Sequence, residues 1–171
     1  MPKVIFYPSG AVGEIPAETT LLDAAESLGL KVRHDCGGFA TCSTCRVWVV
    51  EGIPHLTEID LDEENMLEEA QLPSPFRLSC QAKIKGDVIV RVPDEEMEWS
   101  RSALRELNAY PTELREIIRM MVEKRAREGG IAVILPDTAM PLLAEFGKEV
   151  ETASKNPDRL LVLVKQVLGI P

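Results

Sequence analysis

The chain changes its hydrophobic pattern once, near residues 93–99. Before that point, apolar and β-branched residues come in short runs broken by Gly and Pro, which is typical of strands. The runs predict strands at residues 3–8, 14–18, 46–52, 78–84 and 87–92, the first two joined into a hairpin through residues 9–13. Residues 19–30 instead show helical spacing, with Thr19 or Thr20 as N-cap and Gly29 just past the end. This order predicts a small mixed sheet wrapped over one helix.

Beyond Trp99 the apolar residues recur at helical spacing. The pattern predicts a short helix at residues 102–108, a long helix that starts at Pro111 and stops at Gly129, a helix capped by Asp137 or Thr138 that runs to about residue 150, and a last helix from Pro157. Residues 131–135 are a brief strand or an extended connector. The predicted fold class is therefore α+β, with a mixed-sheet domain over residues 1–94 and a small all-helical domain over residues 95–171.

Composition and charge narrow the range of partners. The chain has 171 residues, of which 45% are hydrophobic and 27% charged, and its formal net charge is −9. This acidic excess repels phosphate backbones, which excludes nucleic acid, and it suits a protein partner with a basic docking surface. Residues 1–94 hold 15 acidic and 8 basic residues, so most of the excess lies in the first domain.

Neither terminus predicts a membrane association. The N-terminus has no basic stretch followed by an apolar run, and the apolar run at residues 160–170 is shorter than the ~20 residues that span a bilayer. We expect a cytoplasmic protein without a membrane partner, in which clustered cysteines bind metal or do redox work. The apolar run at residues 160–170 either packs within the helical domain or forms a homodimer contact.

Four cysteines carry the candidate chemistry. Cys36, Cys42 and Cys45 lie on one loop and Cys80 stands far downstream, in the spacing C-x5-C-x2-C-x34-C. Only Cys42 and Cys45 form a tight pair, whereas zinc sites usually use two such pairs. Three ligands on one loop and one remote ligand are typical of a single [2Fe-2S] cluster, in which each of two irons needs two protein ligands.

The other residues of the loop suit an anionic cluster. Gly37 and Gly38 let the backbone adopt φ > 0, approach closely and turn its N–H groups toward sulfur. Thr41 and Thr44 are small and can add hydroxyl donors. Ordinary buried cysteines and a zinc site are the alternatives. His34 is expected to be a loop residue near the cluster, because a Rieske-type centre needs two histidine ligands.

Residues 1–94 resemble the [2Fe-2S] ferredoxins of the adrenodoxin-like, or iron–sulfur-assembly, branch. The cysteine spacing, the acidic segment DLDEENMLEEA at residues 60–70 and the stretch RLSCQ around Cys80 carry this resemblance. It implies a β-grasp fold and an electron carrier rather than an enzyme. It also implies that Cys36 and Cys42 bind the outer iron, and Cys45 and Cys80 the inner one.

The acidic segment is a candidate docking surface. Its seven carboxylates within twelve residues are Glu58, Asp60, Asp62, Glu63, Glu64, Glu68 and Glu69. Met66, Leu67 and Ala70 are expected to face the core while the acids face water. We predict that a reductase and an acceptor protein dock here, because opposite charges speed encounter, with a plain solvated helix face as the alternative.

Residues 99–150 resemble the small helical domain at the C-terminus of one subunit of the light-independent protochlorophyllide reductase. The matching residues are Trp99, Ala103, Leu104, Leu107, Pro111, Arg115 and residues 123–130. This resemblance implies an accessory module that docks a partner. No Cys or His follows Cys80, and we identify no catalytic group in this part of the sequence.

Together these features predict a one-electron carrier with a [2Fe-2S] cluster, working between a reductase and an acceptor enzyme. One alternative is a non-redox binding or assembly module with a structural metal site. The other is an accessory subunit of a nitrogenase-like or protochlorophyllide-reductase-like complex.

Overall fold

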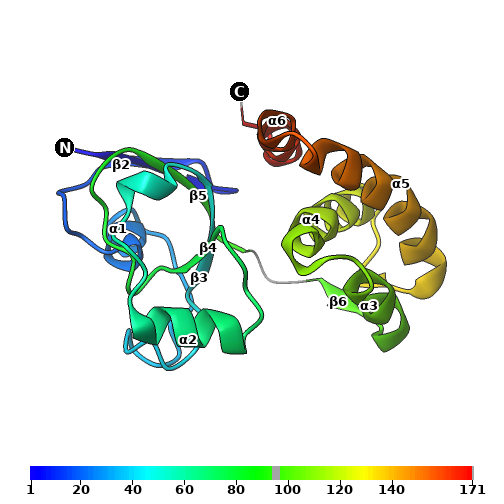
Figure 1. Ribbon diagram of the computed structural model, residues 1–171, viewed down its shortest axis with the longest axis horizontal. Helices are drawn as coiled ribbons and strands as arrows, with labels where there is room; N and C mark the ends of the chain where they lie inside the picture. The colour runs from blue at the N-terminus through cyan, green and yellow to red at the C-terminus, as the bar shows by residue number, and fades with distance from the viewer. Residues whose placement is uncertain (94–96, 171) are drawn as a thin grey trace. The chain divides into compact units, whose positions relative to one another are not determined.

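The computed structural model describes residues 1–93 and 97–170, and the chain forms two compact units, Met1–Asp94 and Glu95–Pro171 (Figure 1). The predicted domain boundary at residues 94 and 95 lies outside the described residues. The predicted α+β fold class is confirmed, because the first unit is built on a mixed sheet and the second is mainly helical.

A five-stranded sheet in the order β2-β1-β5-β3-β4 forms the centre of the N-terminal unit. Its strands are β1 (Lys3–Tyr7), β2 (Ala11–Glu14), β3 (Arg46–Glu51), β4 (Phe76–Leu78) and β5 (Val88–Arg91). β1 and β5 run parallel, and the other neighbouring strands run antiparallel. Val4 and Phe6 on β1, with Val88 and Val90 on β5, are buried at alternate positions, so one face of these strands builds the core.

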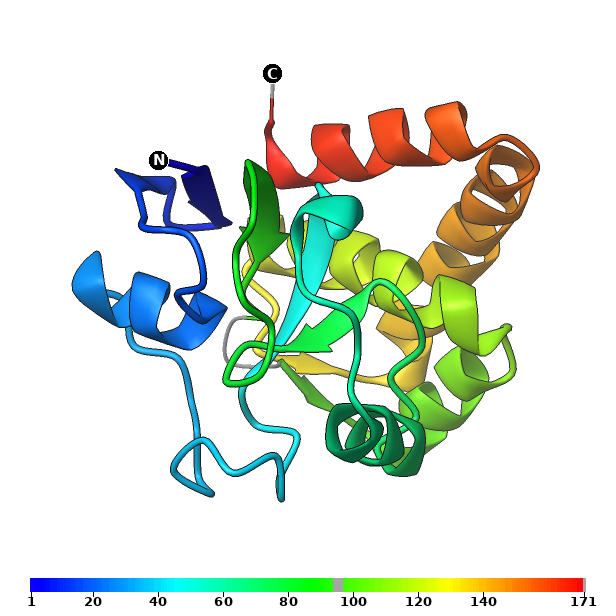
Figure 2. The same cartoon turned by 60° about the vertical axis from the view of Figure 1, so that its left-hand side comes forward.

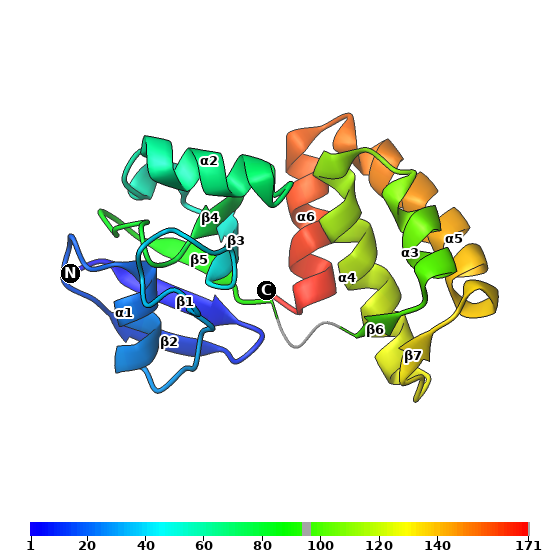
Figure 3. The same ribbon diagram turned by 90° about the horizontal axis from the view of Figure 1, so that it is seen from below.

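Three short helices complete this unit: α1 (Leu21–Ser27), the 3-10 turn η1 (Ile53–His55) and α2 (Leu61–Glu69). The Thr20 hydroxyl accepts from the Asp23 N–H and caps α1, as the sequence predicts. The Asp60 carboxylate caps α2 in the same way, through the Glu63 N–H. α2 packs on β4 (Figure 3).

The predicted return strand of the hairpin is misplaced. The chain turns at residues 8–10, where Gly10 has φ 77° and the Ser9 hydroxyl accepts from the Ala11 N–H, so β2 is residues 11–14 rather than 14–18. Pro16 has no N–H for a sheet hydrogen bond, which ends the strand early.

The prediction of a strand around Cys80 is also wrong. β4 ends at Leu78, whose carbonyl accepts from the backbone N–H groups of Gln81 and Ala82. Cys80 therefore lies in a turn at the end of the strand. Farther along, Ile84 forms an isolated bridge with Leu56 and exchanges backbone hydrogen bonds with Glu18 and Thr19 rather than joining a strand.

The C-terminal unit consists of α3 (Arg101–Asn108), α4 (Thr112–Glu128), α5 (Pro136–Ser154) and α6 (Pro157–Leu168), with β6 (Glu98–Trp99) and β7 (Val133–Ile134) as a two-stranded parallel ladder. α4 contacts each of the other three helices (Figure 3). The Trp99 indole donates to the buried Glu123 carboxylate at 2.8 Å, which ties the ladder to α4.

Three helix starts in this unit differ from expectation, and α3 begins at Arg101, one residue before the predicted start. Pro111 is the N-cap of α4 rather than its first residue. α5 begins at Pro136, ahead of the predicted caps, because proline suits the first helical position. In α6, Leu163 and Val164 are buried, so part of the apolar run at residues 160–170 packs within the unit.

A buried ion pair joins α2 to β4. The Arg77 guanidinium donates to both carboxylate oxygens of Glu63, at 2.7 and 3.0 Å. The same carboxylate accepts from the Leu78 N–H at 3.0 Å. Both side chains are almost fully buried, at 5% and 1% exposed. Glu63 therefore faces inward, which corrects the expectation that all seven acids of the segment face water.

Removing one partner of this pair is expected to destabilise the N-terminal unit strongly. Arg77→Ala leaves a carboxylate buried without a counter-charge, at a cost of about 3–5 kcal/mol. Urea unfolding followed by Trp48 fluorescence, in a Trp99→Phe background, measures the loss.

Arg33→Ala is the matched control, because Arg33 pairs with Asp35 at 2.9 Å with both side chains exposed. It is expected to cost less than about 1 kcal/mol. Equal losses in the two variants would contradict a special role for the buried pair.

Candidate metal centre

The loop of residues 36–45 contains no helix or strand. It projects from the N-terminal unit as the light-blue segment in Figure 2. Three residues on it have left-handed backbone, with φ 72° at Gly37, 95° at Gly38 and 55° at Ala40. A Cβ on Gly38 would lie 3.9 Å from the Cβ of Cys80, an ordinary contact distance, so the loop passes beside the remote cysteine and the φ of 95° is what favours glycine.

The turn after β4 brings Cys80 to this loop. The Ser79 N–H donates to the Cys45 carbonyl at 3.1 Å, and the Ser79 carbonyl accepts from the Leu22 N–H at the start of α1. The turn is thus held between the loop and the helix. Cys45 directly precedes β3, so a strand and a turn fix these two thiols.

The four thiols fall into two pairs. The Cys45 thiol is fully buried and donates to the Cys80 sulfur at 3.4 Å. The Cys36 and Cys42 side chains are also hydrogen-bonded to each other, and both are partly exposed. This is the division that two irons with two protein ligands each would need.

The threonines of the loop bond to its sulfurs. Thr44 Oγ1 lies 3.1 Å from the Cys42 sulfur and also accepts from the Asp35 N–H, which closes the base of the loop. Thr41 bonds to the Cys36 sulfur through both its backbone N–H and its hydroxyl. Each threonine therefore provides a hydrogen-bond partner for one thiol of the loop.

Gln81 is a site residue that the sequence analysis missed. Its side-chain amide donates to the Gly38 carbonyl at 3.0 Å and to the Cys80 sulfur at 3.4 Å. One side chain thus ties the loop to the remote cysteine. Its position directly after Cys80 in the stretch RLSCQ was the signal that could have identified it.

Hydrogen bonds set the acidity of the thiols. The backbone N–H of Thr41 is the main cause that lowers the pKa of Cys36 to about 6. The bond from Cys45 lowers the pKa of Cys80 to about 6, and the same bond, together with burial, raises the pKa of Cys45. The lowered pKa values favour the thiolate form of Cys36 and Cys80, which is the form that binds metal.

A two-iron cluster fits this donor set. Within residues 1–93 and 97–170, no three His, Cys, Asp or Glu side chains converge closely enough to share one metal ion. A [2Fe-2S] cluster requires no such convergence, since its four thiolates divide between two irons. The backbone N–H groups of Gly38, Ala40 and Thr41 point at the sulfurs of Cys36 or Cys80, as an anionic cluster would require.

The two histidines lie outside this donor set. His34 Nδ1 is 2.8 Å from the Val32 carbonyl, and its Nε2 is 3.7 Å from the Glu26 carboxylate. His55 Nδ1 is 2.6 Å from the Asp87 carbonyl. Each ring therefore has an oxygen partner.

The acidic segment keeps a charged outer face without Glu63. Its exposed carboxylates are those of Glu58, Asp60, Asp62, Glu64, Glu68 and Glu69. Of the residues expected to face the core, Leu67 is buried, whereas Met66 and Ala70 are only half-buried.

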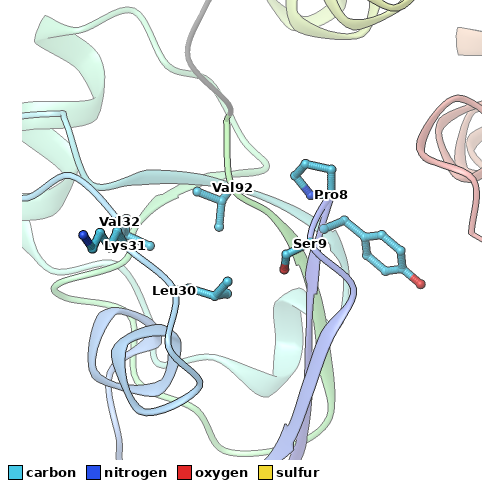
Figure 4. A pocket seen from close by; sticks show the side chains of 7 residues that line it. Pro8, Ser9, Leu30, Lys31, Val32 and Val92 are labelled. Carbon is cyan, nitrogen blue, oxygen red and sulfur yellow. The ribbon is translucent and has the colours of Figure 1, made fainter.

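A separate hollow of about 270 Å³ lies where β1 and β5 end (Figure 4). Leu30 and Val92 point toward each other across it. Its lining is mostly apolar, and the Ser9 hydroxyl there already donates to the Phe6 carbonyl. The hollow thus differs in character from the thiol site.

Comparison with known proteins places the chain in a family. The family model for the 2Fe-2S iron-sulfur cluster binding domain matches residues 6–85. The chain is 36% identical over 111 residues to the 2Fe-2S ferredoxin of Haemophilus influenzae, covering 98% of that protein and 60% of this chain. The chain belongs to the 2Fe-2S ferredoxins. The cofactor of these ferredoxins is a [2Fe-2S] cluster, and they are electron carriers rather than enzymes.

Two further ferredoxins support the assignment. The 2Fe-2S ferredoxin of Escherichia coli is 38% identical over 101 residues, which cover 91% of that protein and 54% of this chain. The crystal structure of the ISC-like [2Fe-2S] ferredoxin from Pseudomonas putida superimposes with a TM-score of 0.51 at 30% identity, covering 94% of that chain and 56% of this one. The predicted β-grasp ferredoxin fold of the N-terminal part and its adrenodoxin-like branch are thereby confirmed. The resemblance of residues 99–150 to the protochlorophyllide reductase subunit stays a prediction.

Nowhere in the described part of this ferredoxin chain is there a helix with the length and apolar character that crossing a membrane requires.

The thiol environment predicts selective alkylation of the cluster-free protein. Only the thiolate reacts with iodoacetamide, so Cys36 and Cys80 are expected to reach half their maximal rates near pH 6, against about 8.5 for an ordinary thiol. Cys45 is expected to stay unmodified, because it is buried and its pKa is raised. Peptide mapping by mass spectrometry over pH 5–9 follows each cysteine. Midpoints near 8.5 at both reactive sites would show that the hydrogen bonds described above do not act.

Proposed function

We propose that this protein carries single electrons between a reductase and an acceptor enzyme on one [2Fe-2S] cluster held by Cys36, Cys42, Cys45 and Cys80. The observation that carries the proposal is the division of these four thiols into two pairs, in a chain that belongs to the ferredoxins. Cys36 and Cys42 would bind one iron, and Cys45 and Cys80 the other.

The bound cluster supplies one-electron oxidation and reduction. Gly37 and Gly38 let the loop close around it, and the N–H groups of Gly38, Ala40 and Thr41 stabilise negative charge on its thiolates. The hydroxyls of Thr41 and Thr44 add donors to Cys36 and Cys42.

The two thiol pairs differ in exposure, so the site has a buried side and a side that faces the protein surface. Cys45 is fully buried beside the start of β3, whereas Cys36 and Cys42 are partly exposed on the loop. Electrons would therefore cross the protein surface at the Cys36 and Cys42 side. The Cys45 side anchors the site to the sheet.

The purified protein tests the cluster assignment directly. It is expected to be red-brown, to contain about two irons per chain, and to lose much of its visible absorption on dithionite with the appearance of a one-electron EPR signal. Cys45→Ser is expected to lose most of the iron, and Ser43→Ala on the same loop is expected to keep it. A colourless protein with zinc would contradict the proposal. A cluster that dithionite leaves unchanged would favour a non-redox module.

We also propose that partners dock on the exposed acids of the segment at residues 58–69. The support is that six carboxylates point outward while Glu63 is held inside by Arg77. The helical unit would add a second contact for partners or for a second copy of the chain, and its resemblance to the protochlorophyllide reductase subunit motivates this role. A homodimer through its exposed apolar residues, such as Val162, is the corresponding alternative.

Neutralising the outer acids is expected to slow electron transfer to a basic acceptor. Asp62→Asn with Glu68→Gln is expected to lower the rate constant for reducing cytochrome c by roughly 3- to 10-fold at low salt, because electrostatic steering weakens. The difference is expected to shrink at about 0.5 M salt, where charges are screened. Stopped-flow absorbance measures both rates.

Glu14→Gln with Glu18→Gln is the control, since these exposed acids lie in the same unit but outside the segment. An equal loss in the control would show that net charge, not the segment, governs the encounter.

A further inference from the structure

Ser79 carries a buried hydroxyl that no other group satisfies. The residue is 1% exposed, and among the residues that the structure describes its Oγ has no hydrogen-bond partner. A buried donor left unpaired is unfavourable, so a folded chain keeps one only where something else uses it. The proposed ferredoxin function offers such a use, because Ser79 lies directly before Cys80.

The backbone of Ser79 is fixed on both sides. Its N–H donates to the Cys45 carbonyl at 3.1 Å, and its carbonyl accepts from the Leu22 N–H at 2.9 Å. These two bonds hold the residue against Cys45, whose side chain is fully buried. The bond to Cys45 continues the antiparallel pairing of Arg46 with Leu78 by one position, and side chains directly opposite each other in such a pair lie on the same face. The buried hydroxyl of Ser79 therefore lies on the same side as the buried Cys45 side chain.

The other three sulfurs each have a side-chain donor. Thr41 bonds to Cys36 and Thr44 to Cys42, and the Gln81 amide donates to Cys80. Cys45 differs, because its own S–H donates to Cys80 in the thiol form. Once Cys45 loses that proton to bind iron, its sulfur becomes an acceptor and Ser79 is the donor placed beside it.

We infer that the Ser79 hydroxyl donates a hydrogen bond to the Cys45 thiolate in the cluster-bound protein. This bond raises the reduction potential of the cluster. The inference rests on the proposed ligand set. Reduction adds negative charge to the site, and a donor at sulfur stabilises the reduced state more than the oxidised one. Burial strengthens this effect, because water does not screen it.

Ser79→Ala is the test, measured as the midpoint of an anaerobic redox titration followed by visible absorption and EPR. The equilibrium constant for reduction is expected to fall about tenfold, which for one electron equals about 59 mV toward more negative potential. Ser27→Ala is the control, because its hydroxyl bonds to the Ala24 carbonyl on α1, and its midpoint is expected to match wild type.

The outcomes separate this inference from the proposed function. A variant with a normal cluster spectrum and an unchanged midpoint overturns the role of Ser79 and leaves the electron carrier intact. A wild-type protein without iron overturns both. Should Ser79→Ala hold no cluster, Ser79→Thr and Ser79→Val are compared, since they match in size and differ in the hydroxyl. The Thr variant is expected to have the higher midpoint, and equal midpoints overturn the inference.

Discussion

The buried pair of Glu63 and Arg77 is the interaction on which the metal site depends most. Arg77 and Leu78 end β4, and both bond to the Glu63 carboxylate. The chain turns immediately afterwards, into Ser79 and Cys80. A break in this contact would release α2 and the end of β4 together, and with them the turn that presents the fourth thiol. Such a pair is costly to form, but removing only one partner costs more, because the other charge then stays buried and unpaired.

A few polar contacts connect the end of β4 to the loop of residues 36–45. Ser79 bonds to the backbone of Cys45 and α1, while Gln81 reaches the Gly38 carbonyl and the Cys80 sulfur. These contacts join residues far apart in the chain around an irregular loop that contributes little apolar packing of its own. They hold the backbone donors of the loop toward sulfur, and donors that are already oriented need little reorganisation when the charge of the site changes.

Short-range rules explain what the sequence predicted correctly, and long-range contacts explain where the prediction failed. The Thr20 cap and the β3 strand follow from short-range rules and were predicted correctly. The strand expected around Cys80 and the solvent-facing role of Glu63 were wrong, because each was decided by a distant partner. Residues 78–84 resemble a strand in sequence, yet the Leu78 carbonyl accepts from Gln81 and Ala82 in a turn that contains Cys80. The Ser79 N–H at the start of this turn bonds to the carbonyl of the distant Cys45. An acid in a helix looks solvated unless a buried arginine is known to face it.

The sequence by itself predicted the candidate donor set and identified its class of chemistry, that of a [2Fe-2S] cluster. Cysteine spacing and two glycines specify a loop that can close on a small anionic cluster, and these are properties of neighbouring residues. Only the tertiary structure decided which thiols lie against each other, which acid turns inward, and that Gln81 bonds to both the loop and Cys80. Those outcomes depend on contacts across 14 to 43 residues of chain, and such contacts form only when the sheet and its helices pack together.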